Sequence, residues 1–155
     1  MNKLKLLFFV FILISCSRNE KIIEGDLAFK SIDLFNYYNL DQKSIDEWEK
    51  VLNDTRQIKN PSAEDVFILN YFDALKKHKV IKSPSIKLKT KDSIIRVYLS
   101  ENDYQKVKNY NSNDLISNNR KVSLKMNIET RGKEIYYCKE LISIKEVHGE
   151  TYTSK

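Results

Sequence analysis

The chain has few of the residues that most often reveal a catalytic or metal-binding site. Its 155 residues include 2 Cys and 2 His, and none of these form a closely spaced pair of the kind that binds zinc. With 3 Gly, it has neither a phosphate-binding loop nor a G-x-S-x-G nucleophile turn. The sequence therefore predicts no catalytic residue, no metal site and no cofactor.

Glycine and proline are also too scarce for a flexible linker or stalk, at 3 Gly and 2 Pro. Hydrophobic residues make up 41% of the chain and aromatic residues 11%, which is enough to bury a core. A chain of 155 residues has room for one ordinary domain. The composition therefore predicts a single folded domain.

The N-terminal residues differ from the rest of the chain. Residues 1–5 carry Lys3 and Lys5 and no acid, and residues 6–14 are an unbroken apolar run. A basic segment followed by a short apolar segment is typical of an export signal. The run is too short to cross a hydrocarbon core, which takes about 20 residues in a helix. We therefore expect a leader rather than a transmembrane anchor.

The end of this run, Leu13-Ile14-Ser15-Cys16, resembles the lipobox of bacterial lipoproteins. The resemblance covers residues 1–17 and implies cleavage before Cys16 and attachment of lipid to its thiol. Two or more acyl chains anchor a protein stably, whereas one binds reversibly. Ser17, rather than Asp, follows the cysteine, which in Gram-negative lipoproteins implies transport to the outer membrane, facing the periplasm. A plain signal peptide that happens to contain a cysteine is the alternative.

The remaining cysteine and the two histidines have structural interpretations. With Cys16 lipidated, Cys138 has no partner for an intramolecular disulfide, and its strand-like surroundings favour a buried thiol over a reactive one. His78 belongs to a basic run that ends a helix, where cations suit the helix dipole. His148 precedes Gly149 in an expected turn.

The sequence predicts an α+β fold: about three N-terminal helices, followed by a small antiparallel β-sheet with one inserted helix. The expected organisation is a leader at residues 1–15, a lipidated cysteine and tether at 16–21, a single domain at 22–150 and a polar tail at 151–155.

Apolar residues at helical spacing predict the three helices. The first covers residues 22–38. The second begins at residue 44 with a capping box formed by Ser44 and Glu47. The third begins at residues 61–65, where acids in the first turn suit the helix dipole. The apolar face of the second helix is expected to consist of Trp48, Val51 and Leu52.

The apolar spacing changes to a period of two after residue 83. We expect a hairpin of residues 86–88 with 94–99, a helix over 100–110 and a strand over 122–128. A second strand over 135–147 changes phase near Lys139 and Glu140, which predicts a bulge that divides it in two. A partly closed five-strand barrel is an alternative. However, the helix would then fall between the second and third strands, which does not fit an OB-fold.

Charge is unevenly distributed in this chain of net charge +6. Residues 19–54 hold nine acids and four bases, whereas residues 76–155 hold eighteen bases and nine acids. The export signal argues against a nucleic-acid partner. Anionic lipids or glycans are the acidic partners of the envelope, and a solvated lysine face is the simpler alternative.

The aromatic pairs Tyr37-Tyr38, Tyr71-Phe72 and Tyr136-Tyr137 are expected to place one ring in the core and the other outward or sideways. Exposed tyrosines gathered on one face would indicate a binding surface.

The functional hypothesis is a lipid-anchored, non-enzymatic binding module of the envelope, whose partner is an envelope protein or an anionic glycan or lipid. An immunity- or inhibitor-type lipoprotein that neutralises a toxin or lytic enzyme is the alternative, and a hydrolase with a dispersed site is the third.

Overall fold

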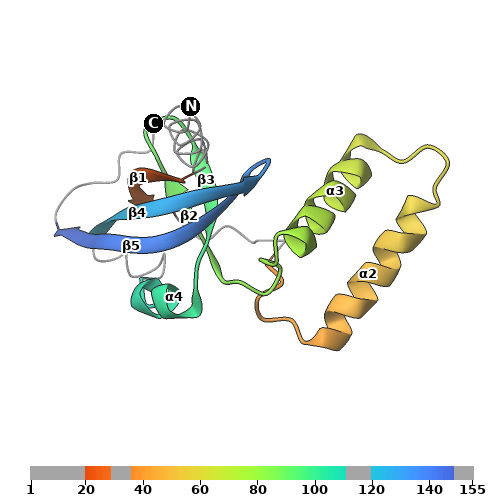
Figure 1. Ribbon diagram of the computed structural model, residues 1–155, viewed down its shortest axis with the longest axis horizontal. Helices are drawn as coiled ribbons and strands as arrows, with labels where there is room; N and C mark the ends of the chain where they lie inside the picture. The colour runs from red at the N-terminus through yellow and green to blue at the C-terminus, as the bar shows by residue number, and fades with distance from the viewer. Residues whose placement is uncertain (1–19, 29–35, 111–119, 149–155) are drawn as a thin grey trace, which may run out of the picture.

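The computed structural model describes residues 20–28, 36–110 and 120–148 (Figure 1). Cys16, the leader at residues 1–15 and the tail at 151–155 lie outside the described residues. In chain order the elements are β1 (Glu20–Leu27), α2 (Gln42–Arg56), α3 (Ala63–Lys77), β2 (Ser85–Lys89), β3 (Ile94–Tyr98), α4 (Glu101–Val107), β4 (Arg120–Gly132) and β5 (Ile135–His148).

The strands close into a barrel in the order β1-β2-β3-β5-β4. Neighbouring strands are antiparallel except β3 and β5, which run parallel where Val97 and Tyr98 pair with Tyr136 and Tyr137. The parallel pair closes the sheet on itself, and closure removes the exposed edges that an open sheet would have.

The prediction of a helix over residues 22–38 is wrong, because β1 occupies its first part. Ile23 and Leu27 are four residues apart, a spacing that fits one face of a helix and equally one face of a strand. In the barrel Leu27 is buried, whereas Ile22 is 63% exposed. Residues 29–35 lie outside the described part of the chain. The last two residues of the predicted tether, Glu20 and Lys21, belong to β1.

Gly25 allows β2 to approach β1 closely. A Cβ atom at this position would lie 2.7 Å from the Lys89 carbonyl oxygen, which is closer than real side chains come. The two strands pair immediately beside it, where Asp26 lies opposite Lys89 and Leu27 opposite Leu88. The glycine therefore marks a backbone contact within the barrel.

The predicted order of helices followed by an antiparallel sheet is therefore wrong. The described chain begins with a strand, two helices are inserted between β1 and β2, and the sheet is a closed barrel that includes a parallel pair. Once β1 is counted, α4 lies between the third and fourth strands rather than the second and third. A five-stranded Greek-key barrel of this kind has the arrangement of an OB-fold.

The inserted helices α2 and α3 form a hairpin that extends from one side of the barrel (Figure 1). At the start of α3 the Ser62 hydroxyl accepts a hydrogen bond from the Asp65 backbone N–H at 3.1 Å, and the Asp65 carboxylate accepts one from the Ser62 N–H at 3.0 Å. This reciprocal capping confirms the predicted start of the third helix.

The start and the apolar face of α2 differ from the prediction. Asp41 is the N-cap and accepts a hydrogen bond from the Ser44 N–H at 2.8 Å, so the capping box predicted at Ser44 is wrong. Leu52 is buried, whereas Trp48 and Val51 are exposed. The buried residues of α2 are Ile45 and Leu52, which are seven residues apart and therefore lie on one face of the helix.

The buried residues form two clusters. The barrel core fills the inside of the barrel: Leu27, Leu88, Val97, Leu99, Val107, Val122, Leu124, Met126, Ile128 and Cys138. The hairpin seam joins the helical hairpin to the outside of the barrel: Tyr37, Leu52, Leu69, Phe72, Leu75, Val80, Tyr98 and Ile135. The seam fixes the position of α3 beside β3 and β5.

The strand β5 is continuous, so the predicted division into two strands is wrong. The predicted bulge is confirmed. Register shifts in the β4–β5 ladder leave Lys139, and later Ile142, without an opposite residue on β4. Because each bulge bends the strand without ending it, β5 can follow the curvature of the barrel along its whole length.

Candidate functional site

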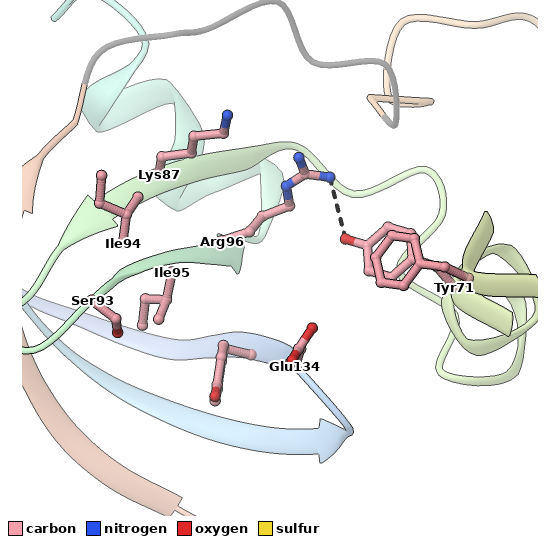
Figure 2. A pocket seen from close by; sticks show the side chains of 9 residues that line it. Tyr71, Lys87, Ser93, Ile94, Ile95, Arg96 and Glu134 are labelled. Carbon is pink, nitrogen blue, oxygen red and sulfur yellow. Dashed lines mark hydrogen bonds between the residues drawn. The ribbon is translucent and has the colours of Figure 1, made fainter. Parts of the chain in front are cut away.

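A hollow of about 540 Å³ lies between the helical hairpin and the outside of the barrel (Figure 2). Its lining comes from α3, β2, β3, β5 and the β4–β5 turn: Phe67, Tyr71, Lys87, Ser93, Ile94, Ile95, Arg96, Glu134 and Tyr136. We call it the main hollow. It is the place where the inserted hairpin and the barrel present side chains to the same space.

The β2–β3 pair forms one wall of the main hollow. Side chains alternate along each strand, so Leu88 and Val97 point into the barrel core while Lys87 and Arg96 point outward. In the ladder Lys87 lies directly opposite Arg96. Figure 2 shows both side chains on the same side of the strand pair.

The opposite wall comes from α3. Phe67 and Tyr71 are four residues apart and therefore lie on the same face of the helix. Their rings stack, with centroids 5.9 Å apart and planes 11° from parallel. Phe67 is 52% exposed, and Ile94 at the far end of β3 is 62% exposed. Two large apolar side chains at the hollow are therefore open to solvent.

A hydrogen-bonded network connects the two walls. The Arg96 Nη1 donates to the Tyr71 hydroxyl at 3.2 Å, and the same hydroxyl lies 2.7 Å from the hydroxyl of Tyr98. The Arg96 guanidinium also lies 5.9 Å from the centroid of the Tyr71 ring. Burial, followed by the nearby Tyr71, raises the pKa of Tyr98 far above its ordinary value, so this phenol stays neutral. The network fixes the position of Arg96 at the back of the hollow.

The turn between β4 and β5 contributes Glu134 to the rim of the main hollow. Glu134 has a φ of 62°, in the left-handed region that favours glycine. Beside it, a Cβ atom on Gly132 would lie 2.8 Å from the His78 Nε2, so the turn packs closely against the end of α3. The barrel turn and the hairpin are thereby held together.

A second hollow of about 310 Å³ adjoins the main one and shares Ser93, Ile95 and Tyr136 with it. Its other lining residues come from β1 and the β2–β3 turn: Lys21, Ile23, Glu24, Thr90, Lys91 and Asp92. The Lys21 ammonium lies 5.4 Å from the centroid of the Tyr136 ring. We call the two hollows together the groove.

The sequence predicts structural rather than functional roles for Cys138, His78 and His148, and the structure tests each of them. Cys138 is 1% exposed, and burial raises its pKa to about 11, which confirms the buried thiol. His78 follows α3 as its C-cap, as predicted, but it is partly buried. His148 is the last residue of β5, so its prediction as a turn residue is wrong.

The sequence does not single out the groove. It predicts that one ring of Tyr71-Phe72 is buried, and Phe72 is in the hairpin seam while Tyr71 lines the main hollow. Tyr136 lines both hollows. The available signal was the pair of basic residues at outward positions of two strands predicted to form a hairpin.

Within the described residues, no group of three or more His, Cys, Asp or Glu side chains lies close enough together to hold a metal ion. None of the described helices is both long and apolar enough to cross a membrane. The comparisons with known proteins find no match among family models, curated proteins or solved structures. The site is therefore interpreted from its own geometry.

Proposed function

We propose that this protein is a lipid-anchored, non-enzymatic binding module of the cell envelope and that the groove binds an envelope glycan. The single observation that carries the choice of site is the main hollow, which the inserted hairpin and the barrel form together. Its volume of about 540 Å³ lies within the range of ligand-binding pockets.

The position of the groove supports the proposal. OB-folds bind oligosaccharides and oligonucleotides on the face of their second and third strands, between the loop that joins strands 1 and 2 and the loop that joins strands 4 and 5. Here α3 belongs to the first of these connections, Glu134 to the second, and Lys87 and Arg96 to the strands between them. The same place in the barrel is therefore open to a ligand.

The chemistry of the lining favours a sugar. A sugar ring has apolar C–H faces and a polar rim of hydroxyl groups. The main hollow combines exposed apolar side chains, Phe67 and Ile94, with polar groups such as Ser93 and Glu134. Apolar walls with a few placed polar groups are typical of small-ligand sites.

The location rests on the resemblance of residues 1–17 to a lipoprotein leader. An anchor at Cys16 would hold the module at a membrane surface outside the cytoplasm, on the periplasmic face of the outer membrane. Glycans are present in that compartment and nucleic acids are rare. Mass spectrometry of the mature protein should find an acylated Cys16 at the N-terminus, and Cys16→Ala should abolish the modification. An unmodified residue upstream of position 16 would contradict the anchor.

Glycan binding can be tested with the full chain purified in detergent. We expect it to bind at least one of four probes: cell-wall sacculi by co-sedimentation, or chitotetraose, mannotetraose and tetragalacturonate by calorimetry. Phe67→Ala should weaken that binding by about tenfold, because it removes the exposed apolar wall of α3. The glycan should be recovered at its original length, because no catalysis is proposed.

Val66→Ala is the matched control, since Val66 is the preceding residue of α3, is exposed and does not line the groove. It should leave binding unchanged. Failure of all four probes to bind, or equal effects of the two substitutions, would contradict a glycan site in the groove.

A further inference from the structure

We propose that one glycan chain occupies both hollows of the groove and runs from the outer face of the barrel into the end of the barrel where β1 and β2 separate. The groove therefore selects linear oligosaccharides over mono- and disaccharides. This inference rests on the proposed glycan-binding function and specifies the length and the path of its ligand.

The second hollow lies where β1 and β2 separate. Among the described residues, β1 pairs with β4 along most of its length, but with β2 only at Asp26 and Leu27. Earlier in β1, Lys21, Ile23 and Glu24 line the second hollow together with the β2–β3 turn. The two strands therefore diverge at this end of the barrel, and the mouths of β-barrels are frequent ligand sites.

The two hollows meet over side chains that also pack against the barrel core. Ile95 and Tyr136 line both hollows, and each is partly buried against that core. Side chains alternate along β3, so the neighbours Ile94 and Arg96 point to the outer face and line the main hollow. The groove therefore passes from the outer face of β3, across Ser93, Ile95 and Tyr136, to the end of the barrel.

The walls of the second hollow are held in place by their own contacts. In the β2–β3 turn, the Thr90 hydroxyl donates a hydrogen bond to the Ser93 carbonyl oxygen at 2.9 Å and accepts one from the Ser93 N–H at 3.2 Å. The Lys21 ammonium lies 5.4 Å from the centroid of the Tyr136 ring, a contact that connects β1 with β5. Because these walls are set before a ligand arrives, binding costs less conformational entropy.

The lining of the second hollow suits a further part of the same glycan. Ile23 and Ile95 provide apolar surface for the C–H face of a sugar ring, while Lys21 donates and Asp92 accepts hydrogen bonds. The volume of about 310 Å³ lies, like that of the main hollow, within the range of ligand-binding pockets. Because the units of a glycan are linked, binding in one hollow raises the effective concentration of the rest of the chain at the other.

The test compares two lengths of each glycan by calorimetry with the full chain in detergent: chitobiose with chitotetraose, mannobiose with mannotetraose, and digalacturonate with tetragalacturonate. Disaccharide and tetrasaccharide fragments of muramidase-digested sacculi complete the series. For the glycan that binds, the tetrasaccharide should bind about tenfold more tightly than the disaccharide, or better. A site confined to one hollow gains only a statistical factor of about threefold, since a tetrasaccharide offers about that many overlapping disaccharides.

The double substitution Lys21→Ala with Asp92→Ala removes two exposed side chains from the second hollow and leaves the net charge unchanged. It should weaken binding of the tetrasaccharide by about fivefold and leave the disaccharide, which fills the main hollow, unaffected. Phe67→Ala should weaken both lengths, because Phe67 lines the main hollow. The matched control is Lys139→Ala with Glu140→Ala, two exposed residues of β5 that do not line the groove, and it should change neither. Circular dichroism of each variant checks that the barrel is folded.

The outcomes separate the inference from the function on which it rests. A gain of about threefold or less from disaccharide to tetrasaccharide would leave a glycan site in place and overturn the two-hollow path. An equal effect of the Lys21 and Asp92 pair on the two lengths, no effect on either, or the same loss in the control pair would also overturn it. Failure of every oligosaccharide and of the sacculi to bind would overturn both proposals.

Discussion

The barrel core and the hairpin seam are built from different kinds of side chain. The barrel core is aliphatic apart from a methionine and the Cys138 thiol, and Leu124, Met126 and Ile128 are fully buried along one face of β4. The hairpin seam includes Tyr37 and Tyr98, whose rings are buried but whose hydroxyl groups require polar partners.

The difference in side chains suits the barrel core to stability and the hairpin seam to recognition. An aliphatic interior has no polar groups to satisfy and can close completely. The hydroxyl groups of buried tyrosines need hydrogen-bond partners. Here the Tyr98 hydroxyl is hydrogen-bonded to the Tyr71 hydroxyl, which also accepts a hydrogen bond from Arg96 at the wall of the main hollow. The hydrogen bonds that satisfy the buried Tyr98 hydroxyl thus connect the hairpin seam with the side chains that line the groove.

The largest expected effect compares one leucine from each cluster. Leu124→Ala removes a fully buried side chain from the barrel core and should lower the free energy of unfolding by about 3–4 kcal/mol. Leu69→Ala acts in the hairpin seam near solvent and should cost about 2 kcal/mol. Denaturant unfolding of the full chain, followed by circular dichroism and by Trp48 fluorescence, measures both.

Trp48 lies on α2 and its ring contacts Tyr37, so its fluorescence reports on the hairpin. In Leu69→Ala the fluorescence change should precede the loss of circular dichroism from the strands. Coincident transitions in that variant, or a cost equal to that of Leu124→Ala, would show that the two clusters unfold as one unit and would break the comparison.

The same two regions differ in how well the sequence predicts them. The alternation of Val122, Leu124, Met126 and Ile128 predicts β4 and its buried face directly, because a period of two has one simple structural solution. The cap at Ser62 likewise predicts the start of α3. Local patterns therefore predict most elements of the barrel and the hairpin.

Closure of the barrel and the groove depend on contacts between distant residues. The spacing of Ile23 and Leu27 does not distinguish a helix from a strand, and Gly25 becomes informative only beside the backbone of β2. The parallel pairing of β3 with β5 consists of two residue pairs, and no local sequence pattern predicts it. Since the groove needs α3 to lie over the outer face of β3, its residues could not be grouped from the sequence.

The second prediction concerns the thiol of the barrel core. Because burial raises the pKa of Cys138 to about 11, above its ordinary value near 9, the folded state holds this proton more tightly than the unfolded state. The stability that this contributes is present below pH 9 and is lost as pH rises to about 11. The loss should be about 2 kcal/mol.

The measurement is the free energy of unfolding at intervals from pH 8 to pH 11, compared between the unsubstituted protein and Cys138→Val. The variant should show a shallower decline over this range, and the native thiol should not react with a thiol reagent at pH 8. Parallel curves for the two proteins would mean that the interior of the barrel admits water, unlike the closed cluster described above.

The third prediction acts on the polar end of the hairpin seam. Tyr71→Phe keeps the ring that stacks on Phe67 but removes the hydroxyl that joins Tyr98 to Arg96. It should cost about 1–1.5 kcal/mol in denaturant unfolding, because the buried Tyr98 hydroxyl loses this partner. An unchanged free energy of unfolding would show that the Tyr98 hydroxyl does not depend on Tyr71.

The smallest expected effect is a gain in stability at the rim of the groove. Glu134 adopts a left-handed backbone conformation that glycine adopts without strain, at φ 62°. Glu134→Gly should therefore raise the free energy of unfolding by about 0.5–1 kcal/mol, the relief of strain being partly offset by the greater freedom of glycine in the unfolded chain. Lys133→Gly, in the same turn but without a positive φ, should lower it by a similar amount.

Binding measurements distinguish the effect of backbone strain at Glu134 from the effect of its charge. Lys79 also has a positive φ but does not line the groove. Lys79→Gly should therefore also raise the free energy of unfolding and should leave binding unchanged. Glu134→Gly should instead tighten binding of tetragalacturonate, since it removes a carboxylate that lines the main hollow, and should do so less at high salt. If Lys79→Gly and Glu134→Gly change binding equally, the rim acts through backbone strain. If only Glu134→Gly does so, the carboxylate at the rim acts on the ligand through its charge, a role for which the barrel core has no equivalent.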